Sequence, residues 1–208
     1  MNRAEDARRW RAAFFLCLLL GALPVRATAF LDDDELVAQL DVCFDFGCKS
    51  EQQIALFESD WRAVRALFAQ SRSAQQERDR IAAAIAMMES IVSAVSPTGV
   101  DRAGNDIPGQ DFRGQMDCID ESNNATTYLR LFQRKGLLRW HQVRERVYRA
   151  PLIIDEHWAA QIEEVPSGER FAVDSWPRAH AMPAVIQPLA HWLAKRDPVE
   201  LATNSVRR

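Results

Sequence analysis

The chain has 208 residues, 48% hydrophobic and 26% charged, which suits one domain with a sizeable core and excludes a low-complexity or collagen-like chain. Residues 1–29 hold five of the 26 basic and two of the 29 acidic residues, which leaves 21 basic and 27 acidic groups, a net charge of −6. Because nucleic-acid binding relies on an excess of basic side chains, we expect no nucleic-acid partner.

Residues 1–29 have the three parts of a secretory signal peptide. Arginines near the start precede an apolar run over 12–23, and the triplet Ala27-Thr28-Ala29 comes just before Phe30. The apolar run is shorter than the roughly twenty residues needed to span a membrane. We therefore expect cleavage after Ala29, a periplasmic or secreted protein, and no stable membrane span after cleavage. Retention as an uncleaved anchor is the alternative.

Three cysteines follow the signal: Cys43, Cys48 and Cys118. In an oxidising compartment, an odd number leaves one thiol unpaired. Cys43 and Cys48 are close in sequence, and Gly47 allows a tight bend between them, so they are the expected disulfide. Pairing of Cys118 with either of them is the alternative, and it would remove Cys118 from any chemical role.

Residues 30–96 are predicted to be the helical part of the domain. The acidic residues 32–35 suit the first turn of a short helix. Apolar residues then recur with helical period over 54–70 and again over 81–95, each time after a serine and a glutamine in the capping-box spacing. These helices are interpreted as core-forming and are given no chemical role.

Residues 97–113 are rich in glycine and proline and are predicted to be a long loop that leads into the stretch 114–136, where a helical pattern begins at Cys118. Cys118 stands where the helical pattern begins, and three apolar residues share one side of the helix: Ala125, Leu129 and Phe132. The dipole and the unpaired N–H groups of a helix N-terminus favour the thiolate, so Cys118 is a candidate nucleophile. A small buried core residue is the alternative.

A small antiparallel sheet is predicted next. Trp140 to Arg149, Glu156 to Val165 and Arg170 to Trp176 have the alternation or the β-branched and aromatic content of strands. A closing helix is expected around 186–193, and residues 196–208 are expected to be a loose tail. The chain is thus predicted to be α+β: N-terminal helices, a cysteine-bearing helix and then a sheet, in one domain over 30–195 with 114–195 as its catalytic part.

A cysteine nucleophile needs a base, and the base needs a group that orients it. His157 begins one predicted strand, and the next carries Asp174. If the turn between them is centred just after Pro166, Asp174 lies opposite Ala159 and within reach of His157. If the turn is centred one residue later, Asp174 faces Gln161 and is too far away.

The other histidines are given simpler roles. His141 is predicted to be exposed on the preceding strand, His180 to lie in a loop, and His191 to lie at a packed surface. Asp120 and Glu121, in the first turn of the cysteine helix, are expected to stabilise the helix dipole and not to bind a metal. Because no zinc-ligand spacing occurs, no metal and no other cofactor is predicted.

The runs GQMDCIDESNNATTYLRLFQRKG, EHWAAQI and GERFAVDSW resemble the catalytic half of the transglutaminase-like superfamily, a papain-like α+β fold. The resemblance covers residues 114–176. By position it implies Cys118 as nucleophile, His157 as base and Asp174 as orienting acid. It further implies an enzyme that cleaves or transfers amide bonds of a peptide or protein through a thioester, as a peptidase, an amidase or an acyltransferase.

Gln115 and Trp158 are candidates for oxyanion or substrate contacts near this triad. The alternative function is a non-catalytic exported binding or assembly module on the same scaffold, in which Trp140, Trp158 and Trp176 line a recognition groove. A binder that uses the basic residues between Arg130 and Arg149 is ranked below both, because those charges suit solvated helix and strand faces.

Overall fold

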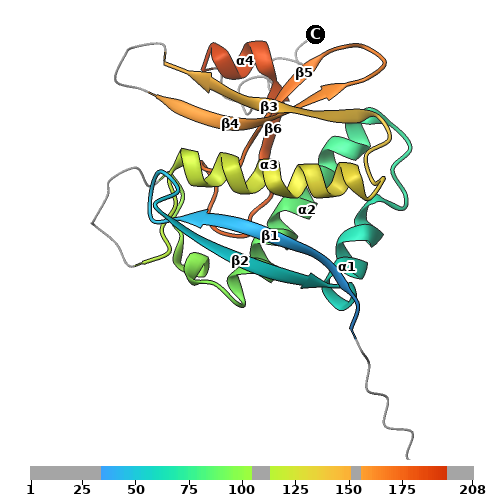
Figure 1. Ribbon diagram of the computed structural model, residues 1–208. Coiled ribbons are helices and arrows are strands. Elements are labelled where there is room, and N and C mark those ends of the chain that lie inside the picture. The colour runs from blue at the N-terminus through green and yellow to red at the C-terminus, as the bar shows by residue number, and fades with distance from the viewer. Residues whose placement is uncertain (1–33, 105–112, 151–155, 196–208) are drawn as a thin grey trace, which may run out of the picture. The chain divides into compact units, whose positions relative to one another are not determined.

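The computed structural model describes residues 34–104, 113–150 and 156–195. The described residues belong to one compact unit that begins at Asp34, whereas the predicted signal peptide, the centre of the predicted loop and the tail lie outside them. The structure combines helices with two small antiparallel sheets, one of strands β1 and β2 and one in the order β3-β4-β5-β6 (Figure 1). The predicted α+β class is therefore confirmed.

The N-terminal part begins with a β-hairpin, so the short helix predicted after residues 32–35 is wrong, and the helix predicted over 54–70 begins only at Glu58. β1 (Leu36–Phe44) pairs antiparallel with β2 (Ser50–Phe57), and α1 (Glu58–Phe68) follows directly. In β2, Ile54 and Leu56 are buried and alternate with exposed neighbours. Because the apolar spacing of β2 continues into α1, the sequence pattern alone predicts a helix that starts too early.

The second predicted long helix is confirmed as α2 (Ala74–Ser93). Ser73 is its N-cap, and the Ser73 hydroxyl accepts a hydrogen bond from the Gln76 N–H at 3.2 Å. After α2, a 3₁₀ turn, η1 (Pro97–Val100), occupies the first residues of the segment predicted to be a loop.

α3 (Cys118–Arg134) is the element around which the others pack, because it contacts both sheets (Figure 1). The three residues of its predicted apolar side are all buried: Ala125, Leu129 and Phe132. The rings of Trp61 and Phe68 pack on Phe132 at centroid distances of 6.2 and 5.4 Å. Burial of the helix body therefore fixes the position of its first residue, Cys118.

The three predicted strands after α3 are confirmed as β3 (His141–Arg149), β4 (His157–Glu164) and β5 (Arg170–Asp174). The closing helix is shorter than predicted, because residues 185–188 form a fourth strand, β6 (Val185–Pro188), before α4 (Leu189–Leu193). Proline lacks an N–H and is tolerated only near a helix start, so Pro188 marks the point where the helix begins.

The β4–β5 ladder decides between the two registers considered for His157 and Asp174. Ala160 pairs with Val173 and Gln161 with Ala172, which is the register of a turn centred just after Pro166. The same alternation puts His157 and Asp174 on the face that carries Ala159, Ala172 and the buried Trp192 of α4. The neighbouring residues Ala160 and Val173 face the main core.

Candidate functional site

Cys118 is the first residue of α3, and two aspartates build the helix start. Asp117 is the N-cap, and its carboxylate accepts hydrogen bonds from the N–H groups of Ile119 at 2.9 Å and Asp120 at 3.0 Å. The Asp120 carboxylate accepts in return from the Asp117 N–H at 3.2 Å, which completes a capping box. The backbone on both sides of Cys118 is thus held by the cap.

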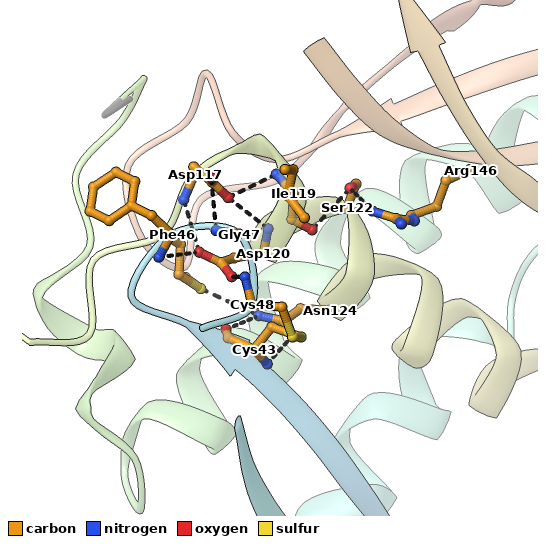
Figure 2. The surroundings of a disulfide bond; sticks show 11 residues. Cys43, Phe46, Gly47, Cys48, Asp117, Ile119, Asp120, Ser122, Asn124 and Arg146 are labelled. Atoms are coloured by element: carbon orange, nitrogen blue, oxygen red, sulfur yellow. Dashed lines mark hydrogen bonds between the residues drawn. A yellow bond between two sulfur atoms is a disulfide. The ribbon is translucent and has the colours of Figure 1, made fainter. Parts of the chain in front are cut away.

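The turn closed by the Cys43–Cys48 disulfide packs on this helix start (Figure 2). Residues 45–48 all have positive φ, between 56° and 69°. The N–H groups of residues 46–48 donate to the carboxylates of Asp117 and Asp120 at 2.6–2.9 Å. These donors favour the charged carboxylates, but burial and the nearby Asp117 charge outweigh them and raise the pKa of Asp120 to about 7.

Asn124 ties the end of β1 to α3. The Cys43 N–H donates to Asn124 Oδ1 at 2.8 Å, and Asn124 Nδ2 donates to the Cys43 carbonyl at 2.9 Å, as a neighbouring strand would (Figure 2). Cys43 is bonded to Cys48, the local pairing expected from the sequence, and Cys118 is the free thiol of the described residues.

The segment that leads into α3 requires a glycine at Gly114. Its φ is 103°, and a Cβ there would lie 2.1 Å from the carbonyl oxygen of Pro97. The Gly114 N–H also donates to Asp45 Oδ1 in the disulfide turn at 2.7 Å. A side chain at this position would displace the backbone just before Cys118.

The structure brings His157 and Asp174 together. His157 Nε2 lies 2.7 Å from Asp174 Oδ2, and the indole N–H of Trp192 donates to the same oxygen at 2.7 Å. The imidazole centroid lies 4.7 Å from the Trp176 ring and 5.5 Å from the Trp192 ring. The ring is therefore oriented by a carboxylate and enclosed by two indoles.

The Cys118 sulfur lies at the start of β4, where the backbone N–H of Trp158 donates to it. Burial raises the pKa of the thiol, and the carboxylates of Asp117 and Asp174 raise it further. The direction is opposite to the acidic thiol expected from the sequence, because burial and two nearby carboxylates outweigh the helix N-terminus. The resting thiol is therefore neutral.

Among the described side chains, no hydrogen bond joins the Cys118 sulfur to the imidazole of His157. The sulfur meets the backbone of β4 at Trp158, whereas the His157 ring projects toward Asp174 and Trp192. The structure thus holds an oriented histidine beside a neutral thiol, and the two are not in hydrogen-bonded contact.

The two candidate oxyanion residues have different surroundings. The side chain of Gln115 is buried and is engaged with the loop before α3: Nε2 donates to the Val100 carbonyl, and Oε1 accepts from the Arg102 N–H at 3.2 Å. The Gln115 side chain thus stabilises the loop, and its amide is used in these hydrogen bonds. The half-buried Trp158 offers its backbone N–H to the sulfur.

The prediction for His141 is wrong, because this residue is buried. His141 Nδ1 lies 2.8 Å from Glu77 Oε1, and Glu77 also accepts from the N–H groups of Arg139, Trp140 and His141. The Glu77 carboxylate thereby holds the start of β3, so this second histidine–carboxylate pair has a structural role. Strand alternation alone could not reveal it, since the partner lies on α2.

Sequence reasoning missed a cluster of buried carboxyl groups beneath the site. Glu121 accepts from the Ser175 hydroxyl at 2.5 Å and shares a hydrogen bond with Asp101, whose carboxylate accepts from the Met116 N–H at 2.6 Å. Burial raises the pKa of Glu121 well above its usual value, so it is a neutral acid and not a charge that stabilises the helix dipole. Burial likewise raises the pKa of Glu89 to about 8.

In the described part of the chain, the residues close enough to share a metal ion are Cys43, Cys48 and Glu51, and the two sulfurs are joined in the disulfide. None of the described helices has the length and apolarity needed to cross a membrane. No family model matches the chain, and no curated protein and no solved structure matches it either.

Proposed function

We propose that the chain is an exported cysteine-dependent enzyme of the transglutaminase-like class, acting on amide bonds of a peptide or protein. The observation that carries the proposal is the 2.7 Å bond between His157 Nε2 and Asp174, next to a helix that begins with a free cysteine. With Nε2 bound to the carboxylate, Nδ1 is the nitrogen that can exchange a proton with the sulfur. An oriented base of this kind is what a thiol nucleophile requires.

The reaction starts when His157 Nδ1 removes the proton from the Cys118 thiol and the sulfur attacks the amide carbonyl carbon. The carbon–nitrogen bond then breaks, His157 returns the proton to the leaving amine, and a thioester remains on the sulfur. Attack by water on the thioester gives a carboxylic acid and makes the protein a peptidase or amidase. Attack by an amine gives a new amide and makes it an acyltransferase.

Two backbone N–H groups near the sulfur are the proposed oxyanion donors. The N–H of Cys118 and the N–H of Trp158 both point toward the Cys118 sulfur. An oxygen that becomes negative on the attacked carbon would lie close to both donors, and loss of one such donor typically costs a factor of about 10²–10³ in rate. These two backbone donors would form the oxyanion site without a contribution from any side chain.

Export is supported by the predicted signal peptide and by the Cys43–Cys48 disulfide, since disulfides persist in oxidising compartments. A second candidate function, a non-catalytic exported binding module, is favoured by one observation. The Cys118 thiol has a raised pKa and no hydrogen bond to His157 within the described structure. In that case, Cys118, His157 and Asp174 would be catalytically inactive, and Cys118 would not form a thioester.

Acylation by p-nitrophenyl acetate distinguishes the two functions. If the proposal holds, the wild-type protein releases p-nitrophenolate in a burst and gains one acetyl group on Cys118, detected by mass spectrometry of the peptide. Cys118→Ser should lose the burst, and His157→Ala should acylate on the order of 10²-fold more slowly, because the thiol then lacks its base.

His180→Ala is the control, since His180 is a partly buried histidine that lies in the loop before β6, away from the His157–Asp174 pair. It should acylate at the wild-type rate. If His157→Ala and His180→Ala both acylate at the wild-type rate, the catalytic proposal is wrong and the binding module is the better account.

A further inference from the structure

The arginines of the described sheet differ in their partners. On β3, Arg144 donates to both oxygens of Glu163, at 2.7 and 3.0 Å, and Arg170 on β5 donates to the same carboxylate at 3.1 Å. Arg146 and Arg149, also on β3, form no ion pair with any carboxylate in the described residues. The arginines without a carboxylate partner are the two on the side of Cys118.

Arg146 is held over the first turn of α3. Its Nη1 donates to the hydroxyl of Ser122 at 3.1 Å, one turn after Cys118 (Figure 2). Its guanidinium lies 4.8 Å from the centre of the Trp158 ring, and Trp158 is the residue whose N–H meets the sulfur. The hydrogen-bond and ring partners of this cation are thus neutral groups, and the neighbouring Glu145, whose charge acts on it, is paired with Arg130 at 2.8 Å.

Arg149 approaches the site from the neighbouring strand. It lies directly opposite His157 in the β3–β4 ladder. Its guanidinium stacks 4.3 Å from the centre of the Trp192 ring and donates through Nη1 to the Trp192 carbonyl. Its Nε is buried and has no hydrogen-bond partner. One donor of this arginine is therefore left unused beside the His157–Asp174 pair.

Both guanidinium groups lie within electrostatic range of Cys118. The charge of Arg146 and that of Arg149 each interact with Cys118, and burial lowers the pKa of both guanidinium groups. The charges of Glu145 and Asp174 act in the opposite direction on Arg146 and Arg149, but burial outweighs them, so binding of a further anion would recover free energy. Guanidinium groups bind carboxylates with particularly good geometry.

We infer that Arg146 and Arg149 form a carboxylate-binding subsite beside Cys118. A substrate would place a carboxylate there, such as an aspartate or glutamate side chain, next to the carbonyl that the sulfur attacks. The reaction itself rests on the proposed function, but the subsite does not, because it requires only the two arginines and the position of the sulfur.

Alkylation of Cys118 by two small reagents tests the subsite. Iodoacetate and iodoacetamide both form a carbon–sulfur bond and release iodide, and they differ in carrying a carboxylate or an uncharged amide. Arg146→Gln and Arg149→Gln should each lower the ratio of the iodoacetate rate to the iodoacetamide rate roughly fivefold, the effect of one unit charge at short range. Arg144→Gln, on the same strand but paired with Glu163, should leave the ratio unchanged.

Equal ratios in the wild type, Arg146→Gln and Arg149→Gln would overturn the subsite. An equal loss of both alkylation rates would overturn it too, because the arginines would then act on the thiolate and not on the reagent. Arg149→Lys, which keeps the charge, should retain most of the ratio and covers the case in which Arg149→Gln does not fold. His157→Ala reports on the proposed function separately, through the iodoacetamide rate alone.

Discussion

At the scale of single residues, Asp174 has two opposite effects on the proposed chemistry. One of its oxygens binds both His157 and Trp192, and this orients the imidazole. The same negative charge raises the pKa of the Cys118 thiol, which disfavours the thiolate. The Trp192 N–H is therefore important, because it spreads the charge of Asp174 and fixes the carboxylate toward the ring.

Trp192→Phe removes this N–H but keeps an aromatic ring near His157. We expect acylation of Cys118 by p-nitrophenyl acetate to fall roughly tenfold, the equivalent of losing one hydrogen bond to a charged carboxylate. Trp140→Phe removes an indole elsewhere and should change the rate little. Equal rates in the two variants would show that Trp192 only packs against the ring.

At the scale of elements, the N-terminal hairpin and α3 form one hydrogen-bonded unit around Cys118. The disulfide turn donates three N–H groups to Asp117 and Asp120, and the end of β1 is bound by Asn124. The hairpin thus also supplies the N–H donors that stabilise the two aspartate carboxylates at the start of α3.

Asn124→Ala tests this connection. It leaves the N–H and the carbonyl of Cys43 buried without partners, so the free energy of unfolding should drop by about 2–3 kcal/mol in urea denaturation. Asn123→Ala, the neighbouring residue on α3, should cost well under half of that. A similar loss in both variants would mean that the side-chain amide of Asn124 contributes no more than a surface residue does.

At the scale of the whole molecule, buried carboxyl groups join distant elements beneath the site. Glu89 on α2, Asp101 after η1 and Glu121 on α3 interact with one another, and the buried Tyr128 interacts with both glutamates. Glu89 also accepts a hydrogen bond from the Ala181 N–H at 2.8 Å, before β6. The cluster is stable because at least one of its acids keeps its proton.

Stability should therefore fall as the pH rises. The folded state holds a proton on Glu89 up to a pKa of about 8, whereas the unfolded chain releases it near 4.5, so this contribution is complete below about 4.5 and is lost on passing through about 8. The melting temperature should drop across this range, and Glu89→Gln should flatten the drop. A melting temperature that rises from pH 5 to pH 8, or an unchanged slope in Glu89→Gln, would contradict the assignment.

Part of this architecture could be predicted from local pattern. The α3 stripe and the start of α2 follow from spacing, whereas spacing left two β4–β5 registers open and the structure decides between them. The β1–β2 hairpin could not be predicted in this way, because the short alternating pattern of β2 continues into a helix with matching apolar spacing.

In the site, pattern brought His157 to Asp174, but the raised pKa of Cys118 depends on burial and on charges from other elements. The partners of Arg149 and Trp192 likewise arise from long-range packing, which no local spacing encodes.

The central claim is that His157 takes the proton of Cys118, and the most direct measurement is the rate of Cys118 alkylation by iodoacetamide from about pH 5 to about pH 10. The wild-type protein should react at neutral pH at least tenfold faster than His157→Ala, whose isolated thiol should gain reactivity only in the alkaline range, because burial and two carboxylates raise its pKa. Superimposable pH profiles for the two proteins would contradict the account.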